Sequence, residues 1–150
     1  MPTIEDVKKW LSRFAENERQ LDNLIERVEL LRSRLESPRA ATVSGMPHGG
    51  GYEGDQIGRT LGQIEKLEEI GQDQLKKSRH LYAEINLTID KITGRAWPDL
   101  RAVLKMRYLD LANWSEINFM LWGGKSDFSD REETYLRRTY RIHAEALEAM

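Results

Sequence analysis

The sequence contains no cysteine and only four prolines in 150 residues. Without thiols the chain has no disulfide framework, no thiolate zinc site and no cysteine nucleophile. The scarcity of proline, together with 32% charged and 39% hydrophobic residues, is typical of long amphipathic helices. The length fits one ordinary domain or two small elements that share a core.

Long apolar runs are also missing. No stretch approaches the ~18 consecutive apolar residues of a transmembrane helix. The first nine residues contain Glu5 and Asp6 in place of the apolar core of a signal peptide. We therefore expect a cytoplasmic protein that does not associate with a membrane.

The chain has no strong excess of either charge. Its formal net charge is -2, and residues 95–150 contain nine basic and nine acidic side chains. Nucleic-acid-binding domains are usually basic overall, so this balance counts against such a function. Any nucleic-acid interface must be a local surface.

Apolar residues recur in alternating steps of three and four over the first 35 residues, with only Glu18 and Arg32 breaking the series. The apolar residues are Ile4, Val7, Leu11, Phe14, Leu21, Ile25, Val28 and Leu35. This heptad seam predicts a long helix that packs on a partner helix and ends before Pro38. The glycine-rich residues 37–54 predict a flexible loop; their His48 and three glycines lack the Gly-Lys-Ser/Thr of a phosphate-binding loop.

A second periodic run follows, with Asp55 as its predicted N-cap. Its members are Ile57, Leu61, Ile64, Glu68, Gly71, Leu75, Ser78, Tyr82, Ile85, Ile89 and Ile92. Matched lengths predict that residues 1–94 form a long antiparallel coiled-coil helical hairpin. The two runs can pair within one chain, between chains as a homo-oligomer, or in both ways.

Residues 95–150 predict three shorter helices in an all-α fold. Pro98 suits the start of the first, whose apolar face is Leu100, Val103, Leu104 and Tyr108. Asn113 with Glu116, and Ser129 with Glu132, predict capping boxes that begin the second and third helices. A short middle helix, a glycine-containing turn and a longer last helix are the order of a helix-turn-helix.

The last helix is predicted to bury a stripe of Leu136, Tyr140, His143, Leu147 and Met150. At 100° per residue the opposite side carries Arg131, Thr134, Arg138 and Arg141, with Arg137 at its edge. Arginine pairs with guanine edges and with phosphates, so this face suits the DNA major groove. Asp130 and Glu145 lie on the same side, and an ordinary solvated face of mixed charge gives the same pattern.

Three segments of this part resemble a known family. They are residues 100–109 (LRAVLKMRYL), 114–117 (WSEI) and 137–147 (RRTYRIHAEAL). They are similar to the fourth conserved region of bacterial sigma factors, and more so to the sigma-like phage transcriptional regulators of the RinA and ArpU type. The chain departs from that pattern in a longer turn at residues 122–128 and in Asn118, where the motif usually has alanine.

The resemblance implies a regulator of phage or prophage origin that contacts duplex DNA through its last helix, together with host RNA polymerase. It makes Arg137, Arg138 and Arg141 the best candidates for base contacts. Asn113 and Ser115, at a helix N-terminus, suit a phosphate contact, with simple capping as the alternative.

Evidence for catalysis is weak. The three histidines are scattered, none has a metal-ligand spacing, and the acidic cluster around Glu65 is interleaved with lysines. We therefore expect no metal, no cofactor and no enzymatic activity. Two other functions remain open, namely a coiled-coil structural or assembly protein without DNA binding, and a DNA-recognition protein similar to phage small terminase subunits.

Overall fold

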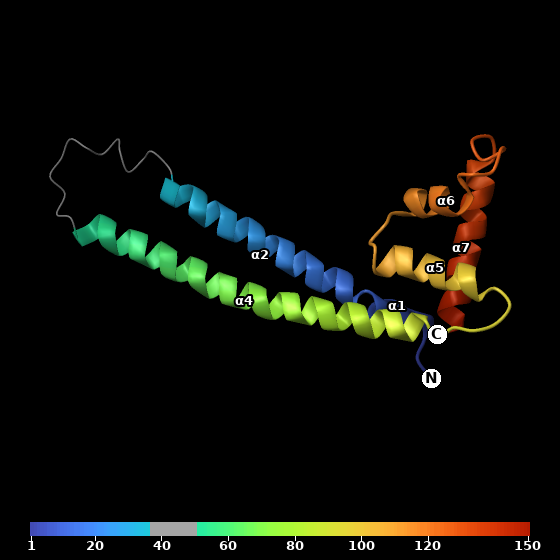
Figure 1. Ribbon diagram of the computed structural model, residues 1–150, viewed down its shortest axis with the longest axis horizontal. Helices are drawn as coiled ribbons and strands as arrows, with labels where there is room; N and C mark the ends of the chain where they lie inside the picture. The colour runs from blue at the N-terminus through green and yellow to red at the C-terminus, as the bar shows by residue number, and fades with distance from the viewer. Residues whose placement is uncertain (37–50) are drawn as a thin grey trace. The chain divides into compact units, whose positions relative to one another are not determined.

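The computed structural model describes residues 1–36 and 51–150, and every regular element in these residues is a helix (Figure 1). This confirms the all-α fold class. The described contacts group the chain into two compact units: residues 1–16 with 78–150 (unit 1), and residues 17–77 (unit 2). The sequence placed a boundary at 94/95, whereas in the structure residues 78–94 pack with the C-terminal helices.

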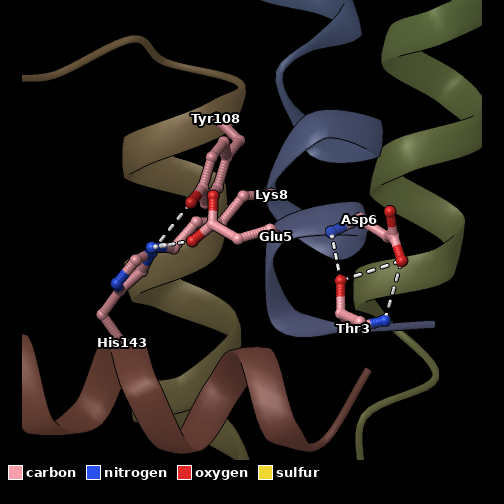
Figure 2. A network of polar contacts seen from close by, with 6 residues as sticks. All are labelled: Thr3, Glu5, Asp6, Lys8, Tyr108 and His143. Atoms are coloured by element: carbon pink, nitrogen blue, oxygen red, sulfur yellow. Dashed lines mark hydrogen bonds and ion pairs between the residues drawn. The ribbon is translucent and has the colours of Figure 1, made fainter.

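The predicted first helix is divided in two. Helix α1 spans Ile4–Leu11, α2 spans Arg13–Glu36, and Ser12 between them forms a turn. A capping box begins α1: Thr3 Oγ1 accepts a hydrogen bond from the Asp6 amide (3.2 Å), and Asp6 Oδ2 accepts one from the Thr3 amide (2.9 Å; Figure 2). The Thr3 amide, together with the Thr3 hydroxyl that also donates to Asp6 Oδ2 (2.8 Å), lowers the pKa of Asp6 below its usual value.

Helix α4 spans Gly51–Ile89 and therefore begins before the predicted N-cap. Asp55 lies inside this helix, so its assignment as the N-cap was wrong. The predicted loop at residues 37–54 is also too long, because residues 51–54 are helical. The rest of that loop, residues 37–50, lies outside the described residues.

Unit 1 contains the larger apolar core. Leu11 of α1, Ile85 and Ile89 of α4, and Leu104 of α5 (Trp97–Tyr108) are fully buried in it. Ala146 and Leu147 of α7 (Glu132–Glu148) complete the cluster. Burying the five large side chains among these stabilises the unit by roughly 10 kcal/mol, at about 1.5 to 3 kcal/mol each.

Unit 2 consists of α2 and the first part of α4, which run in opposite directions (Figure 1). Val28 and Leu31 of α2 are buried against Ile64 of α4. Farther along, Asn17 Nδ2 donates a hydrogen bond to the carbonyl of Gln74 (2.9 Å). Ile25 is 45% exposed and is therefore not part of the buried seam within one chain.

The second predicted seam is likewise only partly buried. Ile57, Leu61 and Tyr82 are exposed, whereas Ile64, Ile85 and Ile89 are buried as expected. Leu81, which the heptad pattern did not include, is buried as well. None of the helices in the described part of the chain is long and apolar enough to cross a membrane.

Candidate nucleic-acid interface

Helix α5 supports the last two helices. Pro98 lies in its first turn, and Leu100, Val103, Leu104 and Tyr108 are buried, which confirms the predicted inner face. The connection to α6 (Trp114–Trp122) is tight: the amide of Ala112 donates to the carbonyl of Met106 (2.9 Å), and Leu111 has a φ of 56°. A leucine in this left-handed region is strained by about 1 kcal/mol.

Helix α6 spans Trp114–Trp122 and begins with the predicted capping box. Asn113 Oδ1 accepts a hydrogen bond from the Glu116 amide (2.8 Å), and the Glu116 carboxylate accepts from the amide and the side-chain nitrogen of Asn113 (3.3 and 3.1 Å). The Asn113 side chain is therefore engaged as a cap. Ser115, one residue into the helix, is exposed.

A buried polar network joins α6 to α7. Asn118 and Thr139 are 1% and 0% exposed. Thr139 Oγ1 accepts a hydrogen bond from Trp122 Nε1 (3.1 Å) and donates either to Asn118 Oδ1 or to the Tyr135 carbonyl (3.1 Å each). Asn118 Nδ2 donates to the Glu132 carbonyl (3.2 Å) in the first turn of α7. This pairing gives the buried Asn118 side chain hydrogen-bond partners on α7.

The turn between α6 and α7 is held by aromatic contacts. The Phe128 ring packs against Phe119 and Tyr135, at 5.9 Å between ring centroids in both cases. Tyr135 Oη donates to Asp127 Oδ1 (2.6 Å), a bond that lowers the pKa of Asp127 and raises the pKa of Tyr135. The turn between α6 and α7 is therefore a packed segment.

Helix α7 begins differently from the prediction. Its N-cap is Arg131, which makes no side-chain capping bond, so the predicted capping box of Ser129 and Glu132 was wrong. Arg131 instead lies 3.9 Å from the Asp127 carboxylate. Hydrogen bonds of the preceding turn, from the Arg131 amide to the carbonyls of Asp127 and Phe128, set the start of the helix.

The inner face of α7 is also rotated relative to the prediction. Tyr135, Thr139, Ala146 and Leu147 are buried, whereas Tyr140 is 44% exposed and Leu136 is only partly buried. The predicted stripe was therefore wrong at Tyr140. The physical reason is the network above, because a satisfied Thr139 hydroxyl lets a polar residue occupy the centre of the buried face.

The rotation changes the positions of the predicted arginines. Arg131, Thr134, Arg137, Arg138 and Arg141 are all exposed. Arg138 lies at the flank of the outer face, with its guanidinium 5.2 Å from the centre of the Tyr135 ring. Arg137, predicted at the edge, and Arg141 lie near the centre of the outer face by helical geometry.

An aromatic cluster brings the start of α6 next to the middle of α7. The Trp114 ring meets Tyr140 and His143 edge to face, at 5.0 and 4.8 Å between centroids. The Arg107 guanidinium lies 4.7 Å from the Trp114 ring. Asn113 and Ser115 therefore belong to the part of α6 that borders Tyr140. The sequence pattern did not distinguish the exposed Tyr140 from a buried core residue.

His143 is the inner member of the cluster. Its Nε2 lies 2.9 Å from Tyr108 Oη. Lys8 of α1 is close by and pairs with Glu5 (Figure 2). Burial lowers the pKa of His143 to about 4, and the charges of Lys8 and Arg107 act in the same direction. The imidazole is thus neutral at neutral pH and serves as a packing group.

The described residues contain no cluster of three or more histidine or acidic side chains arranged to hold a metal ion. Comparisons with family models, with curated proteins and with solved structures give no match for this chain.

Proposed function

We propose that the chain is a sequence-specific DNA-binding transcriptional regulator in which α6 and α7 form a helix-turn-helix and the outer face of α7 enters the major groove. The resemblance to sigma-like phage regulators extends this proposal to a phage or prophage origin, a cytoplasmic location and a contact with host RNA polymerase.

The carrying observation is that Arg137 and Arg141 are exposed and have no ion-pair or hydrogen-bond partner among the described residues. Two other arginines of unit 1 are held by partners: Arg13 pairs with Glu84 (2.9 Å), and Arg101 Nε donates to the Ile92 carbonyl (2.8 Å). Arg137 and Arg141 lie one turn apart and so point the same way. Such a pair has the geometry to contact base edges or adjacent phosphates.

The surroundings of this pair support the proposal. Tyr140 lies beside it with an exposed ring held by Trp114, and the N-terminus of α6 is adjacent through the same contact. Backbone amides at a helix N-terminus, a tyrosine hydroxyl and the Ser115 hydroxyl are groups that commonly contact DNA phosphates. Phosphate contacts there would orient α7 in the groove.

The test is selection from a random duplex pool, followed by binding titrations with the full chain. Arg137→Ala and Arg141→Ala should each weaken specific binding by about 1 to 3 kcal/mol without changing helix content or melting temperature. Arg79→Ala is the matched control, because Arg79 is also exposed in unit 1 and has no described partner. It should bind like the parent.

Salt dependence gives a second readout. Each lost phosphate contact should reduce the slope of log K against log salt by about 1. Failure to enrich any duplex, even at low salt, would overturn the proposal and favour the structural or assembly protein. Equal loss of binding in the Arg79 variant would show a nonspecific charge effect.

A further inference from the structure

A surface groove runs along unit 2 between α2 and α4. Its volume is about 430 Å³, and its apolar lining includes Leu21, Ile25 and Val28 of α2 and Leu75 of α4. Gly71 forms part of the floor, where the absence of a side chain lets Leu24 approach: a Cβ there would lie 3.0 Å from Leu24 Cδ2. The groove is thus an apolar hollow in a two-helix layer.

The two helices leave apolar surface uncovered on this side. Ile25 lines the groove at 45% exposure, and Leu61, at 49%, lies seven and fourteen residues before the lining residues Glu68 and Leu75 and so on the same face of α4. The described buried cluster of unit 2 comprises Val28, Leu31 and Ile64. A second layer of helices, as in a four-helix bundle, would cover this surface.

The charges along α2 indicate which molecule supplies the second layer. Glu18 and Arg32 each lie seven residues from Ile25, one on either side, and therefore share its face. A two-fold axis that passes Ile25 at a right angle to α2 would place Glu18 of one copy opposite Arg32 of the other. The α2 face is therefore complementary to its own antiparallel copy.

Helix α4 has the same arrangement, with one acidic and one basic residue on either side of the point that faces Leu24. The Leu24 contact places Gly71 beside the centre of the α2 face. Glu65 and Lys76 lie six residues before and five residues after Gly71, and both share the face of Gln72, which lines the groove. The same axis would bring Glu65 of one copy opposite Lys76 of the other. An isologous interface has this exchange of opposite charges about its axis.

We propose that the groove of unit 2 is the docking surface for a second copy of this chain. The α2 helices of the two copies pack antiparallel, and the two helical pairs form a four-helix bundle of two layers. The acidic rim residues Glu29 and Glu68 also suit a basic helix of another protein. The paired signs on both helices favour the second copy, because a foreign basic helix would meet the positive charges of Arg32 and Lys76 on this face.

The experiment is sedimentation equilibrium of the full chain over a wide concentration range. The parent should sediment as a dimer at micromolar concentration, and Ile25→Lys should weaken dimerisation at least tenfold. Leu30→Lys is the matched control, because Leu30 is 54% exposed on the same helix but does not line the groove. It should leave the mass unchanged.

A charge exchange tests the proposed axis. Arg32→Glu should weaken dimerisation about tenfold by opposing Glu18 of the other copy, and adding Glu18→Arg should restore it. Arg32 also contacts Glu68 of its own chain, and the double variant controls for this contact, because it stays broken there while dimerisation returns. A monomeric parent, a dimeric Ile25→Lys variant or an unrestored double variant would each overturn the proposal. A monomeric parent would point to a heterologous helix instead.

Discussion

At the residue scale, Asn118 and Thr139 form the best-defined polar contact between α6 and α7. Both are buried, and each satisfies hydrogen-bonding groups that would otherwise lose water without replacement. The sequence showed Asn118 only as a departure from a motif. Nothing in it indicated a partner 21 positions away, because a hydrogen bond between helices has no periodic signature.

Thr139→Val and Asn118→Ala should each destabilise the chain by about 1 to 3 kcal/mol, because each leaves a buried polar partner unsatisfied. The double variant should lose less than the sum of the two, since the orphaned partner is removed as well. Urea unfolding monitored by circular dichroism measures this coupling. Additive losses would show that the two side chains do not act together, and Ser115→Ala, an exposed change on α6, should have little effect.

His143 makes stability depend on pH. The pKa of this group falls from 6.5 to about 4 on folding, so its unfolded form binds a proton in a range where its folded form does not. The contribution is fully present above pH 6.5 and is lost as the pH falls toward 4. The denaturant midpoint should therefore drop across this window, and His143→Gln should flatten the drop. An unchanged slope in that variant would refute the assignment.

At the element scale, periodicity predicted that the helices exist, and it predicted the buried face of α5. It did not predict the turn at Ser12 or the rotation of α7. For α7, two stripes compete: one through Leu136 and Tyr140, the other through Tyr135 and Thr139. They differ by about 100°, and hydrophobicity alone favours the first. The buried hydrogen bonds of Thr139 stabilise the orientation that buries the second stripe.

The end of α6 provides a matched pair of substitutions. An added Cβ at Gly123 would collide with the carbonyl oxygen of Phe119 and lie 2.8 Å from its ring, whereas one at Gly124 would meet nothing within 4 Å. Gly123→Ala should therefore cost about 1 to 3 kcal/mol of unfolding free energy. Gly124→Ala should be within about 0.5 kcal/mol of the parent. Thermal unfolding of both variants is the measurement, and equal midpoints would contradict the close packing.

The first helix allows a similar comparison. Leu11 is fully buried in unit 1, and Ile4 on the same helix is exposed. Leu11→Asp should abolish cooperative unfolding, because an unpaired charge in this core costs several kcal/mol. Ile4→Asp should retain a parent-like transition. A cooperative Leu11→Asp protein with an unchanged midpoint would show that α1 contributes little to the core.

At the scale of the whole molecule, the two units differ in how much apolar surface they bury. The core of unit 1 draws on α1, α4, α5 and α7, whereas the described core of unit 2 is a small cluster around Val28. The sequence showed two long seams of similar strength and did not show this difference. Heptad spacing reports which residues share a face, and burial also depends on how many neighbours cover that face.

Hydrogen exchange should register the difference directly. At low protein concentration, amides of α5 and α7 should exchange at least about tenfold more slowly than those of α2, because local opening costs less where fewer apolar contacts are lost. Mass spectrometry of peptic fragments measures this. Equal protection of α2 at the lowest concentration would contradict it, whereas protection of α2 that rises with concentration is expected from self-association.

The core of unit 1 joins the first helix to the last, since Leu11 packs in one cluster with Ala146 and Leu147. The ribosome therefore makes α1 long before its partner α7 exists. Until α7 is made, the cluster around Leu11 lacks Ala146 and Leu147, so a nascent chain halted before residue 132 should leave α1 more accessible to chaperones and proteases than the finished unit does. Closure of this core therefore waits for the synthesis of α7.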